Sequence, residues 1–271
     1  MDSWIKCLRL PDDDDDLALL LARHVEPLNG LEALDSEHAC QLISDRLGGL
    51  HVPTLQELPI VRGVVGLGAY HAGTYYCSEA KYRRLRETRD PYASEPTLRA
   101  FTAESGVGKS DIMEAIYLLL SRAEPIDLGG DVGRVAIKCC AYIRLRRNIK
   151  LFDVMNMIAA SIGAEEQFTE VTRQGVLVLR QQLYRLGTCL LLVDELQFET
   201  LSSTAHTTLA KLIYFLEGFG IPVVYALNYS AARLLSDYRP EQDLQRFFKA
   251  PTILIPELPD EDSFITQQSE I

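Results

Sequence analysis

The chain has 271 residues, 47% of them apolar, and a formal net charge of −11. A chain of this length forms one large domain, or one domain with an added arm. The charge argues against a surface that is basic throughout, but it leaves room for a local basic patch that could contact nucleic acid. The longest apolar runs, such as residues 189–193, are far too short to cross a bilayer, and the first residues do not resemble a signal peptide. We therefore predict a cytoplasmic protein without membrane association.

The first part of the chain, residues 1–96, has no repeated strand–helix rhythm. Residues 51–58 and 61–76 are rich in Pro, Gly and Tyr, which favours loops with short strands. The apolar spacing predicts helices over residues 17–24 and 31–47, and residues 80–88 are expected to form a short basic helix. We predict that residues 1–96 form a helical and irregular arm that contacts partners.

From residue 97 onward, strands and helices alternate. Strands are predicted over residues 98–102, 134–142, 188–193, 221–227 and 252–255. Helices are predicted over residues 109–121, 151–162, 171–186 and 204–219. This alternation indicates an α/β fold in which a parallel sheet lies between two layers of helices. Residues 97–256 are expected to form this core.

The turn after the first of these strands has the pattern of a phosphate-binding loop. Glycines let the backbone bend so that its N–H groups point at an anion, and the following helix adds its positive end. The lysine is expected to reach the β- and γ-phosphates of a nucleotide, and the serine to bind Mg²⁺. The loop residues are Glu104, Ser105, Gly106, Val107, Gly108, Lys109 and Ser110. Ala103 stands where the motif usually has glycine, and the competing interpretation is a chance match in an ordinary strand–turn–helix.

Two acids follow the third predicted strand of the core. Asp194 is expected at the carboxyl edge of the sheet, where it would hold Mg²⁺. Glu195 would orient and polarise the attacking water. The alternative is a helix N-cap, in which Asp194 caps and Glu195 occupies the first turn. The acidic pair also favours ATPases that have an extra strand between the two motifs. The absence of an N-K-x-D sequence makes GTP the less suitable substrate.

Two further polar residues are candidates for the site. Asn228 ends the next strand and could contact both the γ-phosphate and the water, or simply form a turn. Arg246 precedes the last strand and could reach the γ-phosphate of a neighbouring subunit, or form a surface ion pair.

The motifs resemble those of AAA+ ATPases, and more closely those of the TnsC/TniB family of transposition regulators. The resemblance is carried by residues 104–110, 191–197, 220–228 and 256–261. It implies a sheet of five parallel strands and a homo-oligomer, ring or filament, that assembles on target DNA when ATP binds. It also implies partners, namely a transposase and a target-selection protein. Residues 257–271 are expected to begin a lid that is truncated or vestigial.

A group of cations suggests where duplex DNA could bind. Four cations follow the second core strand with no acid among them: Arg144, Arg146, Arg147 and Lys150. Such a group could track phosphates without reading sequence, or it could be a solvated helix start. The sequence thus predicts an ATP-dependent, DNA-binding regulator of transposition. The alternatives are an ATPase of the replication-initiator or helicase-loader kind, and a nucleotide-switched signalling oligomer that does not bind DNA.

Overall fold

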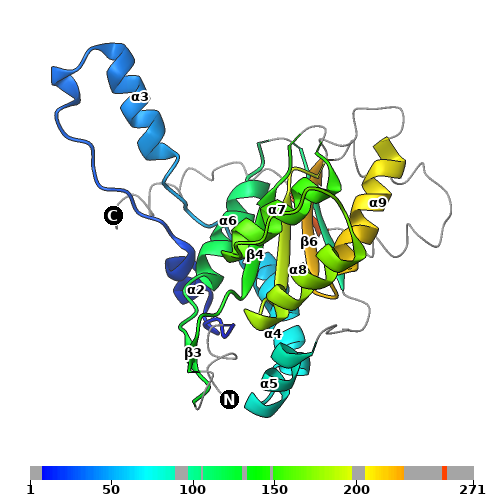
Figure 1. The fold of residues 1–271 in the computed structure, drawn as a ribbon. Coiled ribbons are helices and arrows are strands. Elements are labelled where there is room, and N and C mark those ends of the chain that lie inside the picture. The colour runs from blue at the N-terminus through cyan, green and yellow to red at the C-terminus, as the bar shows by residue number, and fades with distance from the viewer. Residues whose placement is uncertain are drawn as a thin grey trace.

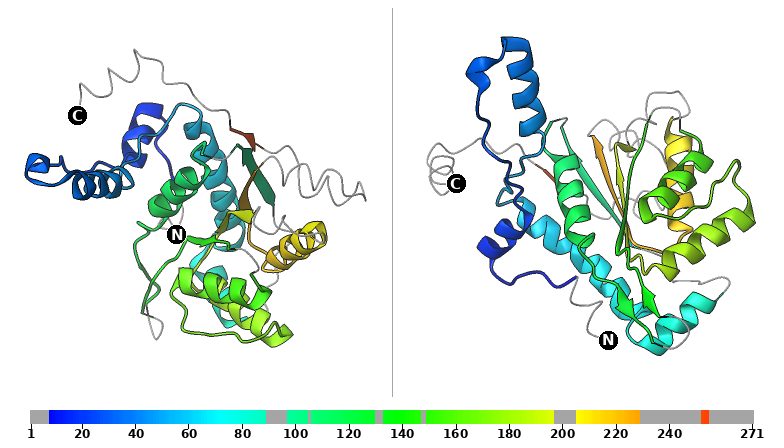
Figure 2. Two further views of the ribbon diagram at one scale, coloured as in Figure 1. Left: turned by 90° about the horizontal axis from the view of Figure 1, so that it is seen from above. Right: turned by 60° about the vertical axis from the view of Figure 1, so that its left-hand side comes forward.

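The computed structural model describes residues 8–88, 97–104, 106–129, 133–146, 149–196, 205–228 and 252–254. A parallel sheet lies at its centre, with helices on both faces (Figures 1 and 2). The strands of this sheet are β1 (Leu98–Ala103), β4 (Cys140–Arg144), β5 (Leu190–Asp194), β6 (Val223–Asn228) and β7 (Thr252–Ile253). They lie in the order β4-β5-β6-β1-β7, and every neighbouring pair is parallel. The predicted five-stranded parallel sheet is confirmed.

The order of the strands also confirms the predicted class of α/β fold. β6 lies between β1, which leads into the glycine loop, and β5, which ends in the acids. This is the extra strand expected between the two motifs. The strands β5 and β6 are buried almost throughout, as expected for parallel strands that are covered on both faces.

Helices follow the strands along the core, as predicted. They are α6 (Lys109–Leu120), α7 (Leu151–Ile162), α8 (Arg173–Arg185) and α9 (Ala205–Glu217). Figure 2 shows α6 on one face of the sheet, and α7, α8 and α9 on the other. One small element was not predicted: β2 (Ile126–Asp127) pairs with β3 (Arg134–Val135) in an antiparallel ribbon. The strand that was predicted over residues 134–142 is therefore divided into β3 and β4.

Residues 8–88 contribute more to the core than the sequence predicts. Their helices are α2 (Asp14–Leu21), η1 (Leu31–Ala33), α3 (Ser36–Leu47), α4 (Glu57–Tyr75) and α5 (Glu79–Glu87). The loops with short strands that were predicted over residues 61–76 are wrong, because this segment is the long helix α4. Side chains of α2 and α4 belong to the same buried cluster as the sheet. The boundary expected near residue 96 is therefore not a break in packing.

Close approach explains one of the glycines of α4, Gly68. A Cβ on Gly68 would lie 3.3 Å from the sulfur of Cys189, which precedes β5. The helix therefore packs tightly against the sheet at this point. Just beyond its end, the buried Tyr76 donates its hydroxyl to the carbonyl oxygen of Thr188 over 3.0 Å. No described helix is both long and apolar enough to span a membrane.

A buried histidine on α4 makes folding depend on pH. The ring of His71 lies 4.6 Å from that of Tyr75 and 6.0 Å from that of Tyr184, and its Nε2 has no hydrogen-bond partner. Burial lowers the pKa of His71 from 6.5 to about 4. The unfolded chain therefore takes up a proton between these two values that the folded chain does not accept.

We expect this histidine to stabilise the fold fully above pH 6.5 and to lose its contribution as the pH falls toward 4. The shift corresponds to about 3 kcal/mol of unfolding free energy. Urea unfolding at pH 7 and pH 4.5 measures the effect in the wild type and in His71→Phe. The wild type should lose more stability between the two pH values than the variant. Equal losses in both proteins would contradict the assignment.

Candidate functional site

Four neighbouring strands bring their carboxyl ends, and the residues that follow them, to one edge of the sheet. Ala103 of β1 is in register with Asn228 of β6, and Arg144 of β4 is in register with Asp194 of β5. Because β6 lies between β1 and β5, the glycine loop, Asn228 and the acids all lie along this edge. The structure thus brings together most of the residues that the sequence predicts for the site.

The glycine loop has the backbone that a phosphate site requires. Gly106 has φ of 87° and Gly108 has φ of 83°, in the left-handed region that favours glycine. A Cβ on Gly106 would meet no atom within 4 Å, so it is φ, and not crowding, that selects glycine there. Ala103 is the last residue of β1, and the extended conformation of a strand needs no glycine. The departure from the usual motif at Ala103 is therefore compatible with the loop.

Lys109 begins α6 and turns back over the loop. Its side chain is 8% exposed, and its Nζ donates to the carbonyl oxygen of Glu104 over 2.5 Å. Burial lowers the pKa of Lys109, while the charges of Glu195 and Asp194 oppose that shift. A phosphate could replace the Glu104 carbonyl as its acceptor, since both are oxygen acceptors.

The acids are held at the end of β5. Asp194 is 2% exposed; its Oδ1 accepts from the backbone N–H of Glu195 over 2.8 Å, and its Oδ2 accepts from the hydroxyl of Tyr142 over 3.1 Å. Glu195 has φ of 62°, the one described residue other than glycine with positive φ. Such a conformation is costly for a side chain with a Cβ and is typical of functional sites. The backbone therefore leaves the extended path of β5 at Glu195.

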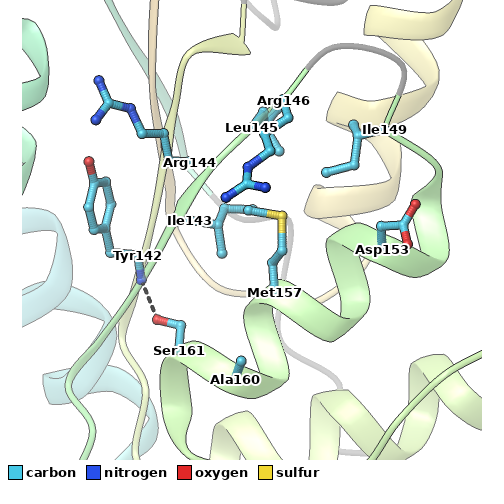
Figure 3. Close-up of a pocket in the computed structure, with 10 residues that line it drawn as sticks. All are labelled: Tyr142, Ile143, Arg144, Leu145, Arg146, Ile149, Asp153, Met157, Ala160 and Ser161. Atoms are coloured by element: carbon cyan, nitrogen blue, oxygen red, sulfur yellow. Dashed lines mark hydrogen bonds between the residues drawn. The ribbon is translucent and has the colours of Figure 1, made fainter.

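A guanidinium group lies between these acids and solvent. Arg144 Nε is 3.5 Å from Asp194 Oδ2, and Arg144 Nη2 is 3.4 Å from Glu195 Oε1. Burial by itself would lower the pKa of Arg144. The negative charges around it, that of Asp194 first, outweigh burial and raise this pKa. Burial, together with the charge of Asp194, also raises the pKa of Tyr142. Figure 3 shows Tyr142 and Arg144 leaving β4 on the same side, away from α7.

The sequence placed Arg144 in a group of four cations that could bind DNA, but in the structure its side chain lies beside the two acids. The basic group is divided: Arg144 contacts the acids, whereas Arg146 points toward Met157 of α7 (Figure 3). Arg146 lines a hollow of about 960 Å³ between β4 and α7, and Tyr142 and Arg144 also belong to its lining. Lys150 is exposed, with its Nζ 5.5 Å from the centre of the Phe152 ring. A role for these three cations in DNA binding stays a prediction.

Three predicted site residues, Ser105, Arg147 and Arg246, lie outside the described residues, as does the expected lid over residues 257–271. The sequence reasoning missed Tyr142 and Arg144 as neighbours of the acids. The signal was available, because β4 and β5 are parallel strands that end at the same edge.

The residues at this edge fit magnesium and a nucleotide. Asp194 provides carboxylate oxygens, and the second residue of α6, Ser110, provides a hydroxyl; hard oxygen ligands of this kind suit Mg²⁺. The N-terminus of α6 and the two left-handed glycines of the loop suit an anion. The guanidinium of Arg144 contacts the same carboxylate oxygens that a cation would use.

Replacing Arg144 with alanine should therefore make magnesium easier to bind. Since the side chain of Arg144 is 60% exposed, solvent screens its ion pairs and the gain is modest. We expect the Mg²⁺ concentration for half-maximal ATP hydrolysis to fall by about two- to fivefold. Arg146→Ala removes the same charge from the other side of the strand and should leave the Mg²⁺ requirement unchanged. An unchanged or higher requirement in Arg144→Ala would contradict the competition.

No protein-family model matches this chain, and no curated protein matches it. Among the solved structures that are similar to it at low identity are the following two. The ORC1 protein of Aeropyrum pernix in complex with DNA is 18% identical, with 71% of this chain and 49% of that chain covered and a TM-score of 0.45. Cdc6p from Pyrobaculum aerophilum is 16% identical, with the same coverage and a TM-score of 0.40. The chain spans about half the length of these proteins. The resemblance to transposition regulators stays a prediction from the motifs.

Proposed function

We propose that this protein binds ATP with magnesium at the edge of the sheet and hydrolyses it. The observation that carries the proposal is the strand order, which brings Lys109, Asp194 and Glu195 to the same edge of the sheet. Lys109 begins α6, which follows the glycine loop after β1, and the two acids follow β5, with β6 between these strands. All three residues therefore lie at the same edge of the sheet. That combination suits a triphosphate with its metal ion.

Each residue has a distinct role in the proposed reaction. Lys109 and the loop N–H groups bind and orient the β- and γ-phosphates. Ser110 and Asp194 would hold Mg²⁺, which neutralises the charge on the phosphates when bound. Glu195 accepts a proton from the attacking water. Asn228 is proposed to contact the γ-phosphate and the water, and Arg246 to act on a neighbouring subunit's nucleotide.

The test of this proposal is steady-state hydrolysis by the purified full chain. Phosphate release should depend on both ATP and Mg²⁺, and GTP should be the poorer substrate. Binding of a fluorescent ATP analogue, measured alongside, separates binding from turnover. A chain that neither binds the analogue nor releases phosphate would overturn the assignment of the site.

We further propose that the nucleotide state controls an assembly on duplex DNA. The exposed cations Arg146 and Lys150 are the described residues that support this step. Two cellular functions would use an assembly on DNA that is controlled by the nucleotide. One is transposition regulation, in which the protein contacts a transposase and a target-selection protein; this rests on the motif resemblance. The other is replication initiation or helicase loading, the type of ATPase to which Orc1 and Cdc6 belong.

A gel shift with duplex DNA distinguishes these jobs from a switch that acts without DNA. At low salt, an ATP analogue should promote DNA binding, and rising salt should weaken it. The double variant Arg146→Ala/Lys150→Ala should bind less DNA while still hydrolysing ATP. Absence of binding at low salt would favour the signalling alternative. Pull-down with a candidate transposase, or with a replicative helicase, then separates the two DNA-dependent jobs.

A further inference from the structure

One tyrosine of the central sheet contacts the buried acid of the site. Tyr142 lies on β4, which is the edge strand in the order β4-β5-β6-β1-β7. Its hydroxyl donates to Asp194 Oδ2 over 3.1 Å. Because Asp194 is only 2% exposed, its carboxylate depends on hydrogen-bond donors of the protein more than on water. Tyr142 is one of these donors.

The backbone, the ring and the hydroxyl of Tyr142 each have a partner. The backbone N–H donates to Ser161 Oγ over 2.8 Å, on the side of β4 where the described sheet has no further strand (Figure 3). The ring lies 5.5 Å from that of Tyr117, on α6, and the hydroxyl is bonded to Asp194. A phenol whose backbone and ring have contacts of their own can hold a carboxylate in one orientation.

The hydrogen bonds of Asp194 leave room for a cation. Each oxygen of a carboxylate has two lone pairs. Oδ1 accepts from the backbone N–H of Glu195, and Oδ2 accepts from the hydroxyl of Tyr142. A lone pair therefore remains on each oxygen, and the guanidinium of Arg144, with its Nε 3.5 Å from Oδ2, competes for the one on that oxygen.

The two neighbours of Asp194 Oδ2 differ in charge. The guanidinium of Arg144 is positive, so it repels a metal ion as well as occupying an oxygen that the ion would use. The hydroxyl of Tyr142 is neutral and does not repel the ion. It can therefore stay bonded to the carboxylate when a metal binds, as the hydrogen-bond partners of metal ligands commonly do.

We infer that Tyr142 is a positioning residue for the metal ion: it holds the carboxylate of Asp194 in the orientation that Mg²⁺ uses. The inference rests on the proposed function, in which Asp194 holds Mg²⁺ beside ATP. Loss of such a partner typically weakens metal binding or activity by about 10- to 100-fold. Tyr142 and Arg144 are thus expected to change metal binding in opposite directions, although both lie on β4 and contact the same oxygen.

A hydroxyl that only satisfies a buried charge would have different consequences. Its removal would lower the stability of the fold, but the metal would bind as before. A positioning hydroxyl, in contrast, changes the part of nucleotide binding that depends on the metal. The two roles are therefore separated by measuring nucleotide binding with and without Mg²⁺.

The experiment measures the Kd of the fluorescent ATP analogue for the purified full chain, in EDTA and in excess Mg²⁺. The wild type should bind more tightly with Mg²⁺, and the ratio of the two Kd values is the gain that the metal provides. In Tyr142→Phe the Kd in EDTA should match that of the wild type. The gain should fall by about tenfold, or disappear where the wild-type gain is smaller than that.

Hydrolysis gives a second measurement on the same variant. Tyr142→Phe should need about tenfold more Mg²⁺ for half-maximal hydrolysis of ATP. Its kcat at saturating Mg²⁺ should stay within a few-fold of the wild type, because excess metal restores the bound state. A variant that is merely loosened in structure would lose kcat at every Mg²⁺ concentration.

The matched control removes another buried phenolic hydroxyl. Tyr184 donates its hydroxyl to the carbonyl oxygen of Gly220 over 3.0 Å. Gly220 precedes β6, whereas the site lies at the carboxyl ends of the strands. Tyr184→Phe should therefore keep the wild-type gain, and thermal melting of both variants measures what each hydroxyl contributes to stability.

The inference is overturned if folded Tyr142→Phe keeps the wild-type gain, or if Tyr184→Phe loses as much of it. Should Tyr142→Phe not fold, Tyr117→Leu removes the ring contact instead and should lower the gain in the same direction. An unchanged gain in Tyr117→Leu would then overturn the inference. A wild type that binds the analogue equally with and without Mg²⁺ would overturn the proposed metal site as well, whereas a gain that survives in Tyr142→Phe overturns this inference alone.

Discussion

Replacing Lys109 with alanine should weaken ATP binding by about 10- to 100-fold, because a charged hydrogen bond to phosphate contributes roughly 1.5–3 kcal/mol. The lysine is 8% exposed and begins the helix that follows the glycine loop. Lys109 is also the one cationic residue of α6. Titration of the fluorescent ATP analogue measures the change directly, without requiring hydrolysis.

The control for this variant is another lysine that loses the same charge. Lys138 is exposed on the segment between β3 and β4, so Lys138→Ala should bind the analogue as the wild type does. Thermal melting of Lys109→Ala shows whether the fold is intact, since a buried side chain has been shortened. A folded Lys109→Ala that binds ATP with wild-type affinity would remove the lysine from the site.

Replacing Glu195 with glutamine should lower kcat by about 100- to 10,000-fold while leaving ATP bound. The amide has nearly the shape of the carboxylate, but it cannot accept the proton of the attacking water. Glu195 is suited to this role by its position, since its backbone is turned out of the strand at φ of 62° directly after the buried Asp194. Single-turnover hydrolysis, with the enzyme in excess over ATP, measures the chemical step by itself.

The neutral amide also changes the surroundings of Arg144, which loses one of its two ion pairs. Binding of the ATP analogue should therefore remain within a few-fold of the wild type. Glu124→Gln, at an exposed acid after α6, should leave kcat unchanged. A Glu195→Gln protein that turns over ATP at the wild-type rate would exclude this residue as the base.

The sequence was a good guide wherever local pattern and burial agree. Helix α7 begins and ends at the residues that apolar spacing predicts, because its apolar face is regular and packs on the sheet. The strand β5 was recognisable because a continuous apolar run is typical of a strand covered on both faces. The glycine loop was recognisable because Gly106 and Gly108 must adopt positive φ.

The sequence failed where tertiary contacts outweigh local preference. The segment 61–76 contains glycines that disfavour a helix in isolation, by about 1 kcal/mol each relative to alanine. It is nevertheless a helix, because it packs against α2, α5 and α6 and buries apolar residues from Leu58 to Ala72. Close packing at Gly68 explains why such a poor helix former stands there.

Arg144 shows a different kind of failure. Its neighbours in the sequence are basic, which suggested a patch for DNA. Alternation along β4 places Tyr142 and Arg144 on one side, and the parallel register with β5 then places them beside Asp194. Arg146 does not share that side although it is two residues further on, because β4 ends at Arg144 and the alternation of the strand ends with it.

The central claim is that Lys109, Asp194 and Glu195 act on a single triphosphate with its magnesium ion. An experimental structure with Mg²⁺ and a slowly hydrolysed ATP analogue tests it most directly. We predict that the γ-phosphate contacts Lys109 Nζ, that Mg²⁺ lies between that phosphate and the side chains of Ser110 and Asp194, and that Arg144 has moved off Asp194. Phosphates bound away from Lys109, or a metal ion that neither Ser110 nor Asp194 approaches, would contradict the account.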